Sequence, residues 1–409
     1  MKILIVSQYF YPETFRVNTL AAELVRRGHD VTVLTGYPQY PAGRIYDGYG
    51  FGVPYEREWR GVHIERVRAL PRGRTPLGLL LNCFTFVTAG KRWVRKCKTV
   101  YDAVYVFEVS PVTVGLPAVE YKKRTGVPLL FNVQDLWPES VEVVLGIKSR
   151  IVIGAINRIV DKIYSASDRI LCASRGMVEN IASRGQDREK LIYWPQFCAE
   201  PMLDGAKKPD EYENGCFNIV FAGNVGEAQG LDLLVDTADK LRDTNVRWFI
   251  VGDGRARDRI SRRVAELGLE ERVKFTGKVP ESEADRYVHY ADCAFLSLKK
   301  NKLFDITIPA KLQTYLACGT PILAAADGEC REIVEKNGCG VACSHDPDAV
   351  AKDIMRLYSD PTALAAMRVN ARNCYIGSFR CETLVKELEE IMHEVAGGDK
   401  DKNYSLQTQ

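Results

Sequence analysis

Several residue types that would point to particular chemistry are scarce in this chain of 409 residues. Only five histidines occur; His29 stands in a turn before a strand-like run, and His63 stands inside another. We therefore assign acid–base chemistry to carboxylates rather than to imidazole. The formal net charge is only +3, so the composition gives no global attraction to nucleic acid, and we expect no nucleic-acid partner.

The cysteines lack the spacing of a metal site or of a disulfide-rich secreted protein. The chain has twelve cysteines, none of them in a CxxC pair, and most lie in apolar runs. This distribution is typical of buried, reduced thiols in a cytosolic protein. Cys339 and Cys343 near His345 leave zinc as a minor alternative. No DxD motif occupies a plausible site, and the chain opens directly on the strand-like KILIVSQ, so we expect no metal, no cofactor and no signal peptide.

Apolar strand-like runs alternate with helical patterns along most of the chain. The runs do not alternate polar and apolar residues, which is typical of parallel strands covered on both faces by helices. The polar segment 199–216 interrupts the pattern, which then starts again. We predict an α/β fold with two doubly wound, Rossmann-like domains facing across a cleft. The predicted parts are 1–198 (N-terminal domain), 199–216 (linker), 217–378 (C-terminal domain), 379–396 (a helix returning to the N-terminal domain) and 397–409 (a disordered tail).

Four motifs in the second half indicate a site for a phosphorylated ligand. They are FAGNVGEAQG at 221–230, VGDG at 251–254, FTGKVP at 275–280 and IPAKLQTYLACGTPIL at 308–323. Glycines after a strand let backbone N–H groups approach an anion, and ligands bind at the strand ends of such sheets. Tight turns alone also require glycine. Lys311 falls in the first turn of a predicted helix, where the helix dipole disfavours a cation; a diphosphate would explain it, and a solvated surface lysine is the alternative.

The order of these motifs resembles family 4 of the GT-B glycosyltransferases. The opening segment MKILIVSQYFYPETFRVNTLAAELVRRGHDVTVLTG and NVQDLWPES at 132–140 also match, and the resemblance extends over residues 1–395. Within this family, the chain most resembles a WbuB-like branch, which transfers an N-acetylated deoxyaminosugar in bacterial O-antigen or capsule assembly. The resemblance implies a GT-B fold and donor binding by Gly223, Asn224, Val225, Gly226, Gln229, Gly252, Asp253, Gly254, Lys278, Val279, Asp305, Thr307, Pro309, Lys311, Leu312 and Thr314.

The chain departs from this family at the diphosphate and ribose contacts. Asn224 and Gln229 stand where the family has an Arg and a Lys, which leaves less positive charge there. Thr314 replaces the second member of the family's glutamate pair, and the first falls near Ile306. We expect Lys311 to supply the missing charge.

Carboxylates at predicted strand ends are the candidates for catalysis. Asp135 follows the run PLLFNV, Glu108 ends AVYVFE, and Glu13 lies in the first loop, so we predict these three as catalytic residues. We predict acceptor binding by Arg16, Asn18 and Glu139. Capping of the first helix remains the alternative for Glu13, Arg16 and Asn18, and stabilisation of a helix start remains the alternative for Glu139.

The segment 66–98 is strongly basic and carries no acidic residue. Its cations are Arg66, Arg68, Arg72, Arg74, Lys91, Arg92, Arg95, Lys96 and Lys98. The apolar run between them is shorter than the roughly 20 residues that span a bilayer, so we expect it to lie in the membrane interface. A core helix with a solvated basic end is the alternative. The residues expected to meet the membrane are Leu79, Leu80, Phe84, Phe86, Arg92, Trp93, Arg95 and Lys96.

The resemblance implies a retaining, metal-independent glycosyltransferase whose N-terminal domain binds the acceptor and whose C-terminal domain binds the nucleotide sugar. The basic segment 66–98 adds the expectation that it lies at the inner face of the plasma membrane. The expected partners are a UDP-sugar, an undecaprenyl-diphosphate-linked saccharide and an anionic membrane surface. One alternative enzyme is a sugar-nucleotide 2-epimerase, which shares this architecture. A non-catalytic, nucleotide-binding subunit of a polysaccharide assembly complex is the alternative of another class, favoured by the neutral Asn224 and Gln229.

Overall fold

The computed structural model describes residues 1–73, 75–146 and 149–397, and these residues form two compact units. Among these described residues, the first unit takes those within 1–173, 177–194 and 385–397, and the second takes 174–176 and 195–384. Each is an α/β unit built on a parallel sheet, so the predicted fold class is confirmed.

Over the described residues, the first unit holds an eight-stranded sheet. Its strands, in spatial order, are β3 (Glu58–Trp59), β4 (Val62–Arg66), β2 (Asp30–Thr35), β1 (Lys2–Ser7), β5 (Ala103–Glu108), β6 (Leu129–Val133), β7 (Arg169–Cys172) and β8 (Leu191–Tyr193). All neighbours pair in parallel except β3 with β4. Strands β1 and β5 are buried almost throughout, which explains their unbroken apolar sequence.

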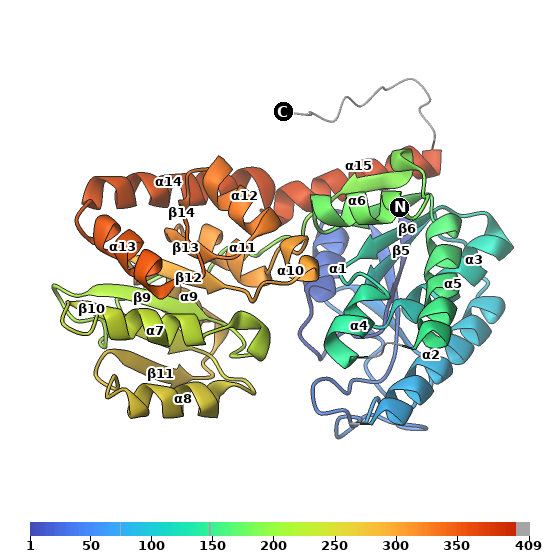
Figure 1. Ribbon diagram of the computed structural model, residues 1–409. Helices are drawn as coiled ribbons and strands as arrows, with labels where there is room; N and C mark the ends of the chain where they lie inside the picture. The colour runs from blue at the N-terminus through green and yellow to red at the C-terminus, as the bar shows by residue number, and fades with distance from the viewer. Residues whose placement is uncertain (74, 147–148, 398–409) are drawn as a thin grey trace. The chain divides into compact units, whose positions relative to one another are not determined.

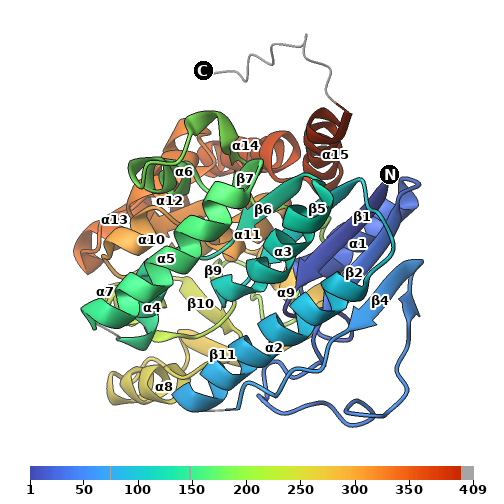
Figure 2. The ribbon, with the colours of Figure 1, turned by 90° about the vertical axis from the view of Figure 1, so that its right-hand side faces the viewer.

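Helices cover this sheet. They are α1 (Arg16–Arg26), α2 (Pro76–Lys96), η1 (Val112–Val114), α3 (Gly115–Thr125), α4 (Glu139–Leu145), α5 (Arg150–Ala166), α6 (Arg175–Ser183), η2 (Arg188–Lys190) and α15 (Cys381–Gly397). Figure 2 shows α2, α3 and α5 running side by side. Gly90 permits the close approach of α2 to α3, because a Cβ there would lie 2.8 Å from Pro117. Gly126 is the C-cap of α3 and has the left-handed conformation that glycine favours at this position.

The second unit, on the described residues, holds a six-stranded parallel sheet (Figure 1). Its strands, in spatial order, are β11 (Val273–Gly277), β10 (Val246–Val251), β9 (Phe217–Ala222), β12 (Cys293–Ser297), β13 (Ile322–Ala325) and β14 (Gly340–Ala342). Its helices are η3 (Glu227–Gln229), α7 (Asp232–Lys240), α8 (Arg257–Glu266), α9 (Glu281–Tyr290), α10 (Lys302–Asp305), α11 (Ala310–Ala317), α12 (Gly328–Lys336), α13 (Pro347–Tyr358) and α14 (Pro361–Ser378). Side chains of α7, α8 and α13 form the core of one face with Trp248 and Phe295.

The segment between the predicted domains packs into the second unit. Tyr212 is buried there, its ring centroid lies 4.5 Å from that of Phe249, and its hydroxyl donates to the Tyr287 carbonyl over 2.8 Å. At the other end of the chain, α15 is held in the first unit by Glu389. One Glu389 oxygen lies 2.8 Å from Arg27 Nη1, and the other lies 2.7 Å from His29 Nε2.

Candidate functional site

Three glycine-containing loops meet at the carboxyl ends of neighbouring strands in the second unit. The backbone N–H of Gly223 donates to Val251 over 2.9 Å, and that of Val225 donates to Asp253 over 2.9 Å. The N–H of Gly252 reaches the Gly277 carbonyl over 2.9 Å. The first three predicted motifs are therefore one connected structure.

Close backbone contact explains two of these glycines. A Cβ on Gly252 would lie 2.0 Å from the Gly223 oxygen, and a Cβ on Gly254 would lie 2.3 Å from the Val225 oxygen. No side chain fits at such distances, so glycine is required for the loops to pack.

The fourth motif places a lysine beneath the first loop. Lys311 Nζ lies 3.7 Å from the centroid of the Phe221 ring and donates a hydrogen bond to Gln229 Oε1. A Cβ on Gly223 would be 3.6 Å from Lys311 Cε. Burial lowers the pKa of Lys311 to about 7, because removal from water disfavours the charged form. Hence Lys311 is not a solvated surface lysine.

Helix α11 holds Lys311 in place through its buried residue Tyr315. The Ala222 N–H donates to the Tyr315 hydroxyl over 2.9 Å, which ties α11 to the end of β9. Pro309 is the N-cap of α11, and Gly319, directly after the C-cap residue Cys318, has the left-handed conformation. Thr314 remains partly exposed on this helix.

Two predicted donor contacts are wrong at the level of side chains. Leu312 and Val225 are both fully buried, so their side chains belong to the core rather than to a ligand site. Leu312 lies one residue beyond Lys311 on the helix and faces inward.

The remaining predicted donor residues lie in the surrounding loops. Asp253 accepts a hydrogen bond from the Gly254 N–H over 2.7 Å, and Thr307 donates to the Leu303 carbonyl over 2.6 Å. Asn224, Gly226, Lys278, Val279 and Asp305 are exposed or half-buried.

The sequence analysis missed Lys299, which lies beside the first loop. Its N–H donates to the Ala228 carbonyl over 2.9 Å, and its Nζ lies 3.4 Å from Glu227. Its place two residues after β12, at the edge where ligands bind in such sheets, is a signal that could have indicated it.

In the first unit, two predicted carboxylates lie together at the ends of β5 and β6. Glu108 is fully buried, and its Oε2 accepts hydrogen bonds from the Gln134 and Asp135 N–H groups, each over 3.1 Å. Burial, and then the charge of Asp135, raises the pKa of Glu108 well above its usual value. Asp135 is partly exposed and accepts from the Ser110 N–H at 3.2 Å and hydroxyl at 2.8 Å. Asp135 is thus the member of the pair that can meet a substrate.

Glu13 lies inside its loop. It is 3% exposed, and its Oε1 accepts from the Gln39 N–H at 2.7 Å and the Tyr40 N–H at 2.6 Å. Burial raises its pKa, and these N–H donors oppose the rise. The Phe10 N–H also reaches Glu13 Oε2, over 3.3 Å, so this carboxylate joins three backbone donors of its surroundings. Its catalytic role stays a prediction.

The three predicted acceptor residues differ in their surroundings. Asn18 is buried and donates to the Glu13 carbonyl over 2.7 Å. Arg16, half-buried, begins α1, and the N-cap of that helix is Phe15, which makes no side-chain cap. Glu139 begins α4 and accepts from Asn180 over 3.3 Å.

Helix α2 exposes an apolar start and a basic end. Leu77, Leu80 and Phe84 are each about two-thirds exposed, and Lys91, Arg92, Arg95 and Lys96 border a hollow near its end. Phe86 is fully buried and is wrongly assigned to a membrane surface, because it lies on the opposite side of the helix from Phe84. Leu79 is half-buried, and Trp93 donates to Glu65 over 3.2 Å. Arg66 is also buried, donating to the Gly36 carbonyl over 2.8 Å.

Neither a membrane-spanning helix nor a metal cluster is found in the part of the chain that the structure describes. No helix there is long and apolar enough to cross a bilayer. No three His, Cys, Asp or Glu side chains there are grouped so that they could hold a metal ion. Cys339 and Cys343 are buried, and burial raises the pKa of each thiol to about 12.

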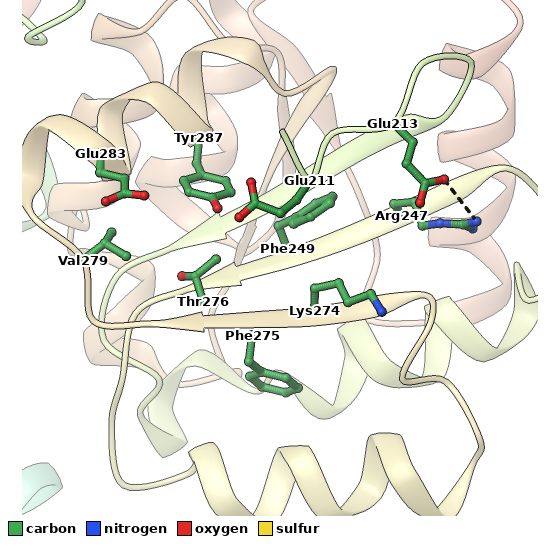
Figure 3. Close-up of a pocket in the computed structure, with 10 residues that line it drawn as sticks. All are labelled: Glu211, Glu213, Arg247, Phe249, Lys274, Phe275, Thr276, Val279, Glu283 and Tyr287. Carbon is green, nitrogen blue, oxygen red and sulfur yellow. Dashed lines mark ion pairs between the residues drawn. The ribbon is translucent and has the colours of Figure 1, made fainter. Parts of the chain in front are cut away.

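A pocket of about 440 Å³ lies over the outer strands β10 and β11 of the second unit (Figure 3). Phe249 and Tyr287 line it, and Glu213 pairs with Arg247 at one end over 3.8 Å. Val279 is the one predicted donor residue in its lining. Of the three glycine loops, the one at 275–280 contributes to the lining, whereas the loops at 221–230 and 251–254 and Lys311 do not.

Comparison with known proteins assigns both units to glycosyltransferases. Residues 14–195 match the model "Glycosyl transferase 4-like domain", and residues 207–374 match "Glycosyl transferases group 1". The chain is a GT-B glycosyltransferase of the family 4 type. This confirms the resemblance at the level of the family and leaves the WbuB-like branch as a proposal.

Two relatives of this glycosyltransferase are named for polysaccharide biosynthesis. The glycosyl transferase WcaI of Escherichia coli (strain K12), named for colanic acid, is 24% identical over 86% of this chain and 89% of its own length. AmsK of Erwinia amylovora, named for amylovoran, is 23% identical over 58% of each chain.

Solved structures share the fold at low sequence identity. Anabaena HepE in complex with UDP has a TM-score of 0.71 and 16% identity, covering 96% of this glycosyltransferase and all of HepE. Sucrose-phosphate synthase from Thermosynechococcus elongatus has a TM-score of 0.73 and 17% identity. The match covers 96% of this glycosyltransferase and 98% of the synthase.

Proposed function

We propose that this glycosyltransferase moves a sugar, N-acetylated as in the WbuB-like branch, from a UDP-sugar to a lipid-linked saccharide in bacterial surface polysaccharide synthesis. The observation that carries the proposal is Lys311, a cation held under a loop of closely packed glycines. HepE binds UDP and UDP-glucose in its solved structures, which supports the donor, and the names of WcaI and AmsK support the pathway class.

The proposed donor site would bind the diphosphate between backbone N–H groups and Lys311. Asn224 and Gln229 bring no charge, so Lys311 and the nearby Lys299 are the cations available to the leaving group. Retaining transfer depends chiefly on stabilising that leaving diphosphate, because negative charge develops there as the glycosidic bond breaks. We propose that this stabilisation needs no metal ion or other cofactor.

We propose Asp135 as the residue that contacts the acceptor hydroxyl. Ser110 fixes its carboxylate through two hydrogen bonds, and burial favours the neutral form of the neighbouring Glu108. A carboxylate in this position can accept the proton that the acceptor hydroxyl loses.

We propose that α2 lies in the anionic inner surface of the plasma membrane. Leu77, Leu80 and Phe84 would enter the interface, and Arg92, Arg95 and Lys96 would meet headgroups. A lipid-linked acceptor, such as an undecaprenyl-diphosphate saccharide, would then be reached from the bilayer. The 2-epimerase and the scaffold subunit are not favoured, since both matched families are transferases.

The first test is the shift in thermal unfolding with UDP, GDP and ADP, each in large excess. A ligand at 100 times its dissociation constant stabilises by about 2.7 kcal/mol, so a true ligand gives a clear shift. A shift with UDP alone is expected. A shift with GDP alone would change the donor class, and no shift with any of the three would contradict nucleotide-sugar binding.

A further inference from the structure

An aromatic cluster of three residues, Tyr9, Phe15 and Tyr40, occupies the carboxyl end of the central strands in the first unit. The rings of Tyr9 and Phe15 are stacked, with centroids 5.1 Å apart and planes 11° apart. Tyr40 closes the cluster, with centroids 5.7 Å from Tyr9 and 5.3 Å from Phe15. Tyr9 follows β1, and Tyr40 lies in the loop after the neighbouring strand β2.

The cluster presents an aromatic surface to solvent instead of closing a core. Tyr9 is 2% exposed, Phe15 is half-buried and Tyr40 is 45% exposed. Exposing a large ring forgoes the free energy that its burial would contribute, so a fixed and exposed aromatic is an informative feature.

Tyr40 is also held firmly. Its N–H donates to the buried Glu13 carboxylate over 2.6 Å, and its carbonyl accepts from the Tyr46 hydroxyl. Burying a carboxyl group opposes folding, as the raised pKa of Glu13 shows. Glu13 thus holds the backbone of Tyr40 in place even though burial of its carboxyl group opposes folding. Such an arrangement is expected of a preorganised binding surface.

Polar groups stand at the edge of the cluster. Burial raises the pKa of Tyr9, and the charge of Arg72 opposes that rise. The Tyr9 hydroxyl is buried and makes no hydrogen bond among the residues that the structure describes. The backbone N–H of Arg72 donates to Gln39 Oε1, which fixes the 67–73 loop against the loop that carries Tyr40. A flat aromatic face beside hydrogen-bond donors matches the apolar face and hydroxyl edge of a pyranose ring.

We propose that Tyr40, supported by Phe15 and Tyr9, is the surface on which a pyranose of the acceptor stacks, with Arg72 at its edge. This inference rests on the proposed function only for the statement that the sugar belongs to the acceptor. It assigns the first unit a specificity-determining subsite at the loops after β1 and β2.

The test measures, by saturation-transfer NMR, whether methyl glycosides of glucose, galactose and N-acetylglucosamine bind to the full chain. These probes carry no lipid tail, so α2 cannot capture them through an apolar chain. We expect at least one to bind, Tyr40→Ala to weaken its binding at least about 5-fold, and Tyr40→Phe to retain it. Phe51→Ala is the matched control, since Phe51 is a 52% exposed ring that packs on Tyr37 outside the cluster.

Absence of binding by all three probes to the wild-type chain would overturn the subsite. Equal affinities of Tyr40→Ala and wild type would overturn it too, as would equal losses in Tyr40→Phe and Tyr40→Ala. The UDP thermal shift of the same variants separates the two proposals. A Tyr40→Ala chain that keeps the UDP shift is folded, and a wild-type chain that binds a glycoside without any UDP shift contradicts the donor proposal alone.

Discussion

Lys311 and Phe221 form a cation–π contact in which the ammonium nitrogen lies 3.7 Å from the ring centroid. The ring closes one side of the lysine, and Gln229 accepts its hydrogen bond. A desolvated cation in this position interacts with a diphosphate more strongly than an exposed one would. The neutral residues at 224 and 229 thus coincide with a half-buried lysine that provides charge at the same loop.

Substituting Lys311 with Met keeps the volume of the side chain and removes its charge. We expect UDP to bind about 10- to 100-fold more weakly, because a charge-assisted hydrogen bond is lost. Isothermal titration calorimetry measures this. Lys352→Met, at an exposed position on α13, is the control and should bind UDP as wild type does.

UDP binding should depend on pH through Lys311. Its pKa of about 7 in the unliganded chain means that the lysine loses its proton as the pH rises through 7. A diphosphate binds the protonated form, so affinity should fall about 10-fold between pH 7 and pH 8.5. Calorimetry across this pH range measures the UDP affinity of the wild-type chain and of Lys311→Met. If the affinity of Lys311→Met falls with pH as steeply as that of the wild type, another group causes the pH dependence.

Gly254→Ala should disrupt the joined glycine loops. Its Cβ would meet the Val225 oxygen at 2.3 Å, so the loops must separate, and we expect a loss of about 1–3 kcal/mol in the free energy of unfolding together with weaker UDP binding. Chemical denaturation gives the first quantity. Gly377→Ala, in a helix with open space around it, should instead be neutral or stabilise by up to about 1 kcal/mol.

Asp135→Asn should lower the rate of sugar transfer about 100-fold or more without changing UDP affinity. Ser110 would still be able to hold the amide, so the fold should persist. The measurement is transfer from radiolabelled UDP-N-acetylglucosamine to a membrane-lipid extract. Asp47→Asn, an exposed loop residue, is the control, and equal rates for both variants would remove Asp135 from catalysis.

Leu80→Ser with Phe84→Ser should weaken binding to vesicles of anionic phospholipid at least about 10-fold, because two apolar side chains no longer enter the interface. Co-sedimentation measures the bound fraction. The control pair is Val369→Ser with Ile376→Ser, two exposed apolar residues on α14. Reversing Arg92, Arg95 and Lys96 to Glu should also reduce binding, and unchanged binding in both α2 variants would contradict membrane contact.

Local patterns were sufficient to predict most helices and strands. Glycines such as Gly126 and Gly319 mark helix ends, because they adopt the left-handed backbone conformation there. The strands β1 and β9 are buried, so their apolar sequences can be recognised in a short segment. Short elements such as α10, α12 and β14 escaped prediction, since three to nine residues carry little periodicity. The buried positions of Leu312 and Phe86 also escaped it, because the side of a helix that faces the core depends on partners far away in sequence.

The sequence alone determined the α/β class, the two parallel sheets and the glycosyltransferase family, because alternating elements and glycine loops are local and ordered along the chain. Only the tertiary structure decided which polar side chains can act. It placed Lys311 against Phe221 and Gln229, joined Glu13 to the backbone of Tyr40, and left Asp135 partly exposed above the buried Glu108. These roles depend on distance and burial among residues that are remote in sequence, and no local pattern encodes them.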